Sequence, residues 1–139
     1  MQITPFNEIE KKNVLNEATI LRRDFHQHPE LSGQEYRTSE SIKAFLKENG
    51  IEYIHGYAQT GVLAVIKGER AGATIALRAD IDALPIQEQV ESAYKSTKDN
   101  VMHACGHDAH TAMMLVTAKQ LHDHRENIEG TVLCVFQTS

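Results

Sequence analysis

The chain has 139 residues, 41% of them hydrophobic and 24% charged, which is typical of one globular domain with a buried core. Its formal net charge is −5 and it has no basic cluster, which argues against nucleic acid as a partner. No apolar run reaches the length of a membrane span, and residues 1–8 lack the pattern of a signal peptide. Two cysteines make no disulfide framework, so we expect a reducing compartment such as the cytoplasm.

Two helices separated by a turn are predicted in the first 50 residues. Residues 6–27 form the first helix, which His28-Pro29 ends because the residue before a proline avoids helical dihedrals. Residues 30–33 form a turn, and residues 35–49 form the second helix, which stops at Gly50. The apolar stripe expected to face inward consists of Ile9, Leu15, Ala18, Ile20, Leu21 and Phe25 in the first helix and of Ile42, Phe45 and Leu46 in the second.

The rest of the chain predicts strands and one further helix. Apolar, β-rich runs predict strands over residues 51–55, 61–66, 74–77 and 131–136. The short turn between the second and third runs predicts that these two pair as an antiparallel hairpin, with residues 131–136 in the same sheet. Residues 108–124 predict a helix capped by Asp108, with Ala112, Met113, Val116 and Leu121 facing inward. The predicted fold class is therefore α/β, a mixed sheet with flanking helices.

The densest group of reactive side chains is His103-Ala104-Cys105-Gly106-His107-Asp108-Ala109-His110. Thiolate sulfur and neutral imidazole nitrogen are preferred ligands of zinc and similar ions. Cys105 and His107 are two residues apart, so in an extended segment both point to one side, as does His103, and Gly106 gives the loop conformational freedom. The pattern favours a metal site over a packed loop. A Cys–His nucleophilic pair is the alternative, and it needs an imidazole within hydrogen-bond reach of the sulfur.

A second polar cluster, Arg78-Ala79-Asp80-Ile81-Asp82-Ala83-Leu84-Pro85, follows the run of residues 74–77. Strand ends in α/β sheets are where ligands usually bind. Asp80 and Asp82 share a side, and because like charges disfavour each other, a cation such as Arg78 or a metal should lie close to them. Alone, the cluster is equally typical of a solvated turn with an Asp-stabilised bend. Together with the cysteine–histidine stretch it predicts a site.

Three stretches together resemble the metal-dependent amidohydrolases that cleave N-acyl amino acids. They are Leu21-Arg22-Arg23-Asp24-Phe25-His26-Gln27-His28-Pro29-Glu30-Leu31-Ser32 with Glu35, then residues 77–85, then residues 102–112. The family includes aminoacylases, hippurate hydrolases, auxin-conjugate hydrolases and N-acetyl-diaminopimelate deacetylases, within the dinuclear zinc-exopeptidase superfamily. The order and spacing of the stretches also match. The resemblance therefore implies that residues 1–139 are the N-terminal part of a truncated zinc-exopeptidase-like catalytic domain, without its remainder or its lid and dimerisation domain.

The resemblance implies roles for several of these residues. Cys105 and His107 are identified as two ligands of a centre for two divalent ions, which are zinc, manganese, nickel or cobalt, and Asp82 as the residue that supports this centre. Asp80 stands where the wider superfamily usually has a histidine ligand. The secondary candidates are His103, Asp108, His110 and Asp80. His26 and His28 are expected to be packed or capping residues.

The implied reaction hydrolyses a small N-acyl amino acid to a carboxylic acid and an amino acid. In the family, the last strand runs on through Phe-Gln-Pro-Ala-Glu-Glu, whose glutamates are the general base and a metal ligand, whereas here Gln137 is followed by Thr138-Ser139. Glu88 and Glu91 are expected to be solvated and not to replace that base.

The alternative function is that of a catalytically inactive remnant with at most a metal-binding or association role. The apolar residues 131–136, expected to lie on an unpaired strand edge, predict association of the chain with itself.

Overall fold

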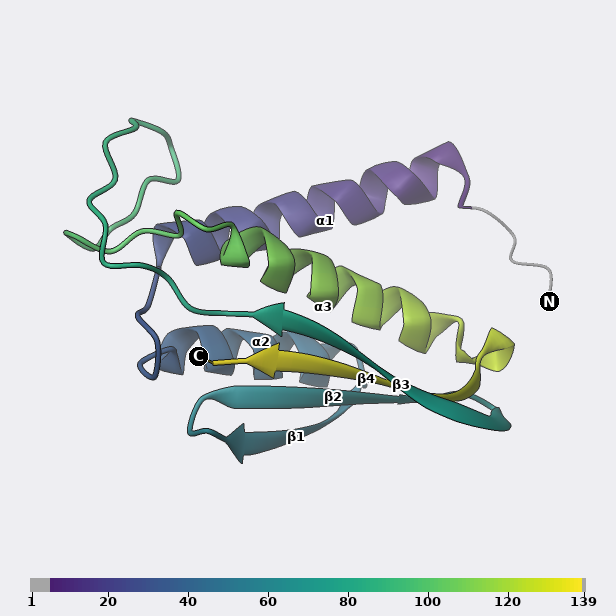
Figure 1. Ribbon diagram of the computed structural model, residues 1–139. Helices are drawn as coiled ribbons and strands as arrows, with labels where there is room; N and C mark the ends of the chain where they lie inside the picture. The colour runs from purple at the N-terminus through teal and green to yellow at the C-terminus, as the bar shows by residue number, and fades with distance from the viewer. Residues whose placement is uncertain (1–5, 139) are drawn as a thin grey trace.

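The computed structural model describes residues 6–138, and the expectations for residues 1–5 and for Ser139 lie outside them. Along the chain the elements are three helices, four strands and a short 3₁₀ helix (Figure 1). Their bounds are α1 (Glu8–Gln27), α2 (Tyr36–Glu48), β1 (Glu52–Tyr57), β2 (Gly61–Lys67), β3 (Arg70–Asp80), α3 (His107–Asp123), η1 (Arg125–Asn127) and β4 (Glu129–Gln137).

The four strands form one mixed sheet, as predicted, but the predicted hairpin is wrong. The strand order is β1-β2-β4-β3, with β4 antiparallel to β2 and parallel to β3. Val135 of β4, for example, faces Leu63 of β2 on one side and Arg78 of β3 on the other. β2 and β3 are therefore not neighbours, because a strand from the far end of the sequence lies between them.

The molecule has a sheet, a layer of helices on the sheet and a further helix outside that layer. α2 and α3 pack against the strands, and α1 packs along α3 on the side away from the sheet (Figure 1). Alternate residues of β4 face the helices, so that Val132, Cys134 and Phe136 are buried, whereas Leu133 and Val135 on the opposite face are half-buried. Within the described residues, no helix has the length and apolar character needed to cross a membrane.

The helical stripes were predicted with mixed success. Ile42, Phe45 and Leu46 of α2 are buried, which confirms that stripe. In α1, the prediction that Ile9, Leu15 and Ile20 face inward is wrong, since these side chains are 74%, 66% and 70% exposed. In α3, Ala112 and Val116 are buried and Leu121 is half-buried, but Met113 is exposed. The physical reason for the error in α1 is that this helix packs mainly on one other helix, which covers only a narrow strip of its surface.

The sequence predicts an unpaired strand edge at residues 131–136, and this prediction is also wrong. Because β4 pairs on both sides, the expectation that residues 131–136 have an unpaired edge is wrong. β3 is the outer strand beside β4, and its Ile75 and Leu77 are exposed even though they belong to the face that the helices cover. The exposed edge therefore belongs to β3.

Candidate metal centre

Backbone bridges bring the three sequence stretches together just beyond the end of β3. The amide of Ala83 donates to the carbonyl of Glu30 at 2.8 Å, and Leu84 and Met102 exchange two backbone hydrogen bonds at 2.9 and 3.0 Å. The segment after β3 is thereby held between the turn after α1 and the segment that leads into α3. Residues that are far apart in the sequence consequently form one polar site.

α3 begins directly at one of the predicted ligands. Gly106 has φ 91°, a left-handed conformation that glycine adopts without strain, and the chain turns there into the helix whose first residue is His107. His107 Nδ1 lies 2.9 Å from Asp82 Oδ1 and 3.0 Å from the Asp82 carbonyl oxygen. Because Nδ1–H donates to Asp82, Nε2 carries the lone pair. A carboxylate that holds one imidazole nitrogen in this way is the usual support of a histidine that binds metal through the other.

Asp80, the last residue of β3, and Asp82, two residues beyond it, make different contacts with His107. Asp82 bonds to its Nδ1, whereas Asp80 Oδ2 lies 3.8 Å from its Nε2. The predicted cation beside the carboxylates is Arg78, which donates to Asp80 at 2.7 Å. Cys105 is exposed two residues before His107. The described hydrogen bonds of His107 go to Asp82, which does not favour a Cys–His nucleophilic pair.

The two flanking histidines differ in their surroundings. His103 is only 4% exposed, and neither of its ring nitrogens has a hydrogen-bond partner among the described residues. Burial lowers the pKa of His103 to about 4, although the nearby Asp108 acts in the opposite direction. The imidazole is therefore neutral at pH 7, which is the form that binds metal. His110 is exposed, and its ring centroid lies 5.6 Å from that of His107.

The donors fit a divalent ion in their chemistry but are too few to enclose one. An exposed thiol and a free imidazole nitrogen supported by a carboxylate suit zinc and its borderline neighbours. Across residues 6–138, however, no three His, Cys, Asp or Glu side chains are arranged so that they could hold an ion. By themselves, these residues do not complete a metal site.

A buried ionic network lies beside the site, and two predictions are corrected by it. Asp108 does not cap α3, because its Oδ2 accepts from Arg22 Nε at 2.8 Å and lies 2.7 Å from His26 Nδ1. Glu88 is not solvated, because its Oε1 lies 3.0 Å from His26 Nε2 and its Oε2 accepts from the Ser96 amide at 2.6 Å. Burial raises the pKa of Glu88, but the bonds from Ser96 and His26 outweigh it and hold that pKa below its usual range.

Sequence reasoning missed this network, although it contained a signal for part of it. Arg22 and His26 are four residues apart, so they lie on the same face of α1 and can bind one acid together. Nothing in the local pattern identifies that acid as Asp108, which is 82 residues from His26. The expectation that His26 and His28 are packed or capping residues agrees with the structure, since His26 is buried and the His28 ring bonds to the Asp24 carbonyl at 2.8 Å.

Comparisons with known proteins agree with this picture. Residues 76–139 match the sequence profile of peptidase family M20/M25/M40. An N-acetylcysteine deacetylase of Bacillus subtilis is 51% identical over 84% of this chain and 31% of the relative. An IAA-amino acid hydrolase of Arabidopsis thaliana is 49% identical over 84% of this chain and 27% of the relative.

Among solved structures, a Bacillus subtilis protein described as a dinuclear metal-binding peptidase of the M20 family matches with a TM-score of 0.89. It is 47% identical over 92% of this chain and 36% of that chain. The chain therefore spans about a third of the length of the proteins it matches. The similarity covers most of the described fold, including the site beyond β3.

Proposed function

We propose that the chain, whose residues 76–139 match the sequence profile of peptidase family M20/M25/M40, forms part of a metal-dependent amidohydrolase that cleaves small N-acyl amino acids. Cys105 and His107 are its metal ligands, and Asp82 supports them. The observation that carries the proposal is the 2.9 Å bond between His107 Nδ1 and Asp82, with Nε2 on the side of Asp80 and the exposed Cys105 two residues earlier in the chain. The further ligands and the general base come from outside the 139 residues, in keeping with the greater length of the relatives.

Each residue of the site has a defined task in this proposal. Two divalent ions, when bound, provide a water of lowered pKa and polarise the amide carbonyl of the substrate. Asp82 keeps the proton of His107 on Nδ1 and fixes the direction of Nε2. Cys105 contributes a thiolate, a ligand that favours zinc, cobalt or nickel over harder ions such as magnesium. Arg78 neutralises Asp80 and so reduces the repulsion between the carboxylates beyond β3.

The relatives support the substrate class. One is named as a deacetylase of N-acetylcysteine and another as a hydrolase of IAA-amino acid conjugates, so both names describe an acyl group removed from an amino acid. The two acyl groups differ greatly in size. The part that is common to these substrates is the amide bond to an amino acid, and we assign this class to the chain.

A chimera tests the proposal directly. Residues 6–138 replace the matching segment of the Bacillus subtilis N-acetylcysteine deacetylase, and release of amino acids from N-acetyl substrates is measured with added zinc, manganese, cobalt or nickel. We expect metal-dependent hydrolysis that is lost in Cys105→Ala and His107→Ala. It should persist in His55→Ala, a control at an exposed histidine on β1. A folded chimera whose activity is indifferent to Cys105 and His107 would contradict the assignment.

The isolated 139-residue chain is expected to show no useful turnover in the same assay. Two metal donors do not hold a dinuclear centre, and the buried glutamate of the adjoining ionic network, Glu88, is already bonded to His26 and Ser96. Loss of general acid–base assistance alone typically costs about 10²–10⁴-fold in rate. Metal-dependent turnover by this chain, abolished in Cys105→Ala, would show that the described residues contain a base that we have not identified.

A further inference from the structure

A buried ionic chain joins three separate segments at the start of α3. His26, near the end of α1, is 3% exposed and lies between two carboxylates that are themselves buried. Its Nδ1 is 2.7 Å from Asp108 Oδ2 in the first turn of α3, and its Nε2 is 3.0 Å from Glu88 Oε1 in the loop of residues 85–101. Both ring nitrogens of His26 therefore lie within hydrogen-bond distance of a buried carboxylate oxygen.

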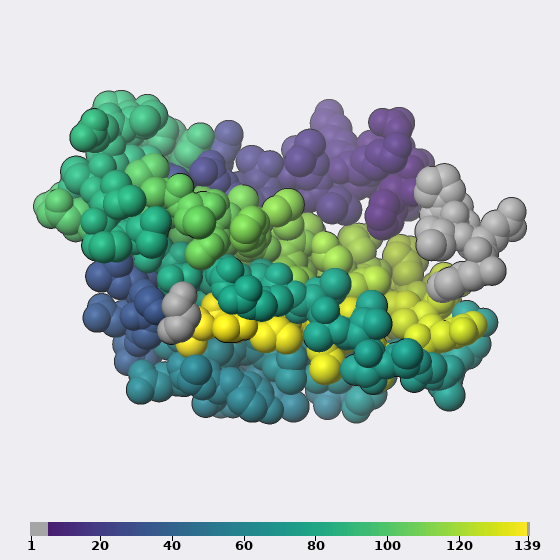
Figure 2. All heavy atoms as spheres, in the orientation of Figure 1, coloured from purple at the N-terminus to yellow at the C-terminus, as the bar shows by residue number. Residues whose placement is uncertain are grey.

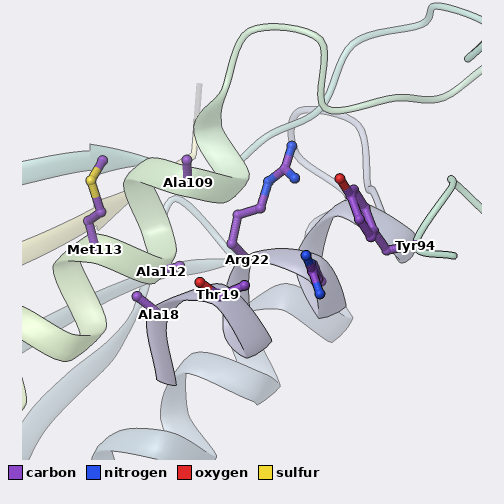
Figure 3. Close-up of a pocket in the computed structure, with 8 residues that line it drawn as sticks. Ala18, Thr19, Arg22, Tyr94, Ala109, Ala112 and Met113 are labelled. Atoms are coloured by element: carbon purple, nitrogen blue, oxygen red, sulfur yellow. The ribbon is translucent and has the colours of Figure 1, made fainter. Parts of the chain in front are cut away.

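Two further contacts attach the same loop to the same helix. The Tyr94 ring meets the His26 ring edge-on at 5.7 Å, and the Arg22 guanidinium lies 5.3 Å from the Tyr94 centroid while its Nε bonds to Asp108. Figure 3 shows Arg22 reaching from α1 towards the first turn of α3, with Tyr94 beside it. In Figure 2 the loop forms a lobe at the end of the molecule where α1 ends and α3 begins. The loop is thus fixed to α1 and, through His26, to α3.

We infer that His26 is a positioning residue for the metal ligands, because Asp108 directly follows His107. Asp82 holds the His107 ring from one side, while His26 and Arg22 hold the next residue of the helix from the other. The two residues held in this way, His107 and Asp108, directly follow Gly106, where the left-handed conformation lets the chain turn into the helix. His26 therefore fixes the direction in which the first turn of α3 presents His107.

The expected effect of His26 on metal affinity rests on the proposed function, whereas its role in holding the first turn of α3 does not. Glu88→Gln changes the end of the ionic chain in the loop, and His26→Asn changes its middle member. Because removing one member leaves a buried charge unpaired, both variants are used, so that one informative protein remains if the other fails to fold. The matched control is Glu91→Gln, the same change three residues away in the same loop, at a carboxylate that is 84% exposed.

The first measurement needs no metal. Amide exchange at Ala109 and His110, whose amides bond to the Gly106 carbonyl, reports on the first turn of α3, and exchange at Cys134 in central β4 reports on the whole fold. We expect Glu88→Gln and His26→Asn to accelerate exchange in the first turn at least about tenfold more than at Cys134, and Glu91→Gln to match the unmodified chain. Equal acceleration at both places, or none, overturns the positioning role.

The second measurement is cobalt affinity, followed by the absorption of the thiolate complex. If the unmodified chain shows this band, both variants should weaken cobalt binding about 10- to 100-fold and Glu91→Gln should not, as is typical for groups that support metal ligands. Unweakened binding in the variants overturns the inference. If the unmodified chain shows no thiolate band, its two donors do not hold cobalt by themselves; the chimera then tests the proposed metal function, and amide exchange alone decides whether His26 positions the helix.

Discussion

The bond between Asp82 and His107 is the most informative contact at the scale of single residues. It places Nδ1 of His107 against the Asp82 carboxylate, while Nε2 lies 3.8 Å from Asp80 Oδ2, an arrangement typical of a histidine supported for metal binding. The sequence predicted that the stretch containing Asp82 and the stretch containing His107 form one site, and their 2.9 Å contact confirms that the two meet, whereas the ligand roles of Cys105 and His107 stay a prediction. Glu88 and His26 could not be paired in this way, since their contact spans 62 residues and depends on how the loop folds back onto α1.

His103 makes the stability of the fold sensitive to acid. Its pKa is lowered to about 4 by burial, against about 6.5 in an unfolded chain. The unfolded state therefore binds a proton that the folded state does not, so stability is complete above pH 6.5 and falls as the pH decreases towards 4. At pH 5 the loss amounts to about 2 kcal/mol.

Urea unfolding at pH 7 and pH 5 measures this effect. The difference in the free energy of unfolding between the two pH values should be clearly smaller in His103→Asn than in the unmodified chain. Since both proteins share all other titrating groups, the comparison isolates the contribution of His103. An unchanged difference would mean that His103 takes up its proton in the folded protein as readily as in the unfolded one.

At the scale of elements, the end of β4 is held by a buried carboxylate. Glu35 is fully buried, its Oε1 accepts from Thr138 at 2.6 Å, and its Oε2 accepts from Thr60 at 2.8 Å. Thr138 departs from the proline that the resemblance leads one to expect at this position, and its hydroxyl also accepts from the Gly33 amide at 3.2 Å. In this chain, Thr138 therefore joins the turn after α1 to the C-terminal end of β4.

Removal of that hydroxyl should weaken the fold. Thr138→Val keeps the shape of the side chain but leaves Glu35 Oε1 buried without its donor, which typically costs about 1–3 kcal/mol. The control is Thr74→Val on the exposed strand β3, where we expect a change within about 0.5 kcal/mol. Urea unfolding at pH 7 gives both values. Equal stability of the two variants would show that Glu35 finds another partner.

The elements themselves could be predicted where the local pattern decides them. α2 and the strands follow from apolar periodicity and from the glycines that bound them. The order of the strands could not be predicted, because the short turn after β2 is typical of a hairpin and gives no sign that β4 inserts beside β2. The burial of α1 was predicted wrongly for a similar reason, since an apolar stripe does not reveal whether a sheet or a single helix covers it.

At the scale of the whole molecule, the sheet of the described residues has two outer strands, β1 and β3, and one open face. β3 is the outer strand with Ile75 and Leu77 exposed, and Leu63, Val65, Leu133 and Val135 are only half-buried on the face opposite the helices. A long exposed strand with apolar neighbours is a template for pairing with another chain. The predicted self-association of the 139-residue chain therefore moves from β4 to β3.

Sedimentation of the isolated chain tests this expectation. At tens of micromolar, roughly, we expect a concentration-dependent dimer or larger species. Ile75→Lys places a charge on the edge strand and should restore the monomer, whereas Ile9→Lys, at an even more exposed isoleucine on α1, should not. A monomer in the unmodified chain, or equal behaviour of the two lysine variants, contradicts association through β3.

The central claim is that Cys105 and His107 are metal ligands, and cobalt titration followed by absorption tests it most directly. Cys134 is fully buried and burial raises the pKa of its thiol to about 11, so Cys105 is the thiol available to the ion. We predict a thiolate-to-cobalt charge-transfer band that is absent in Cys105→Ala and weakened in His107→Ala and Asp82→Ala. A band of unchanged intensity in Cys105→Ala would contradict the assignment of the site.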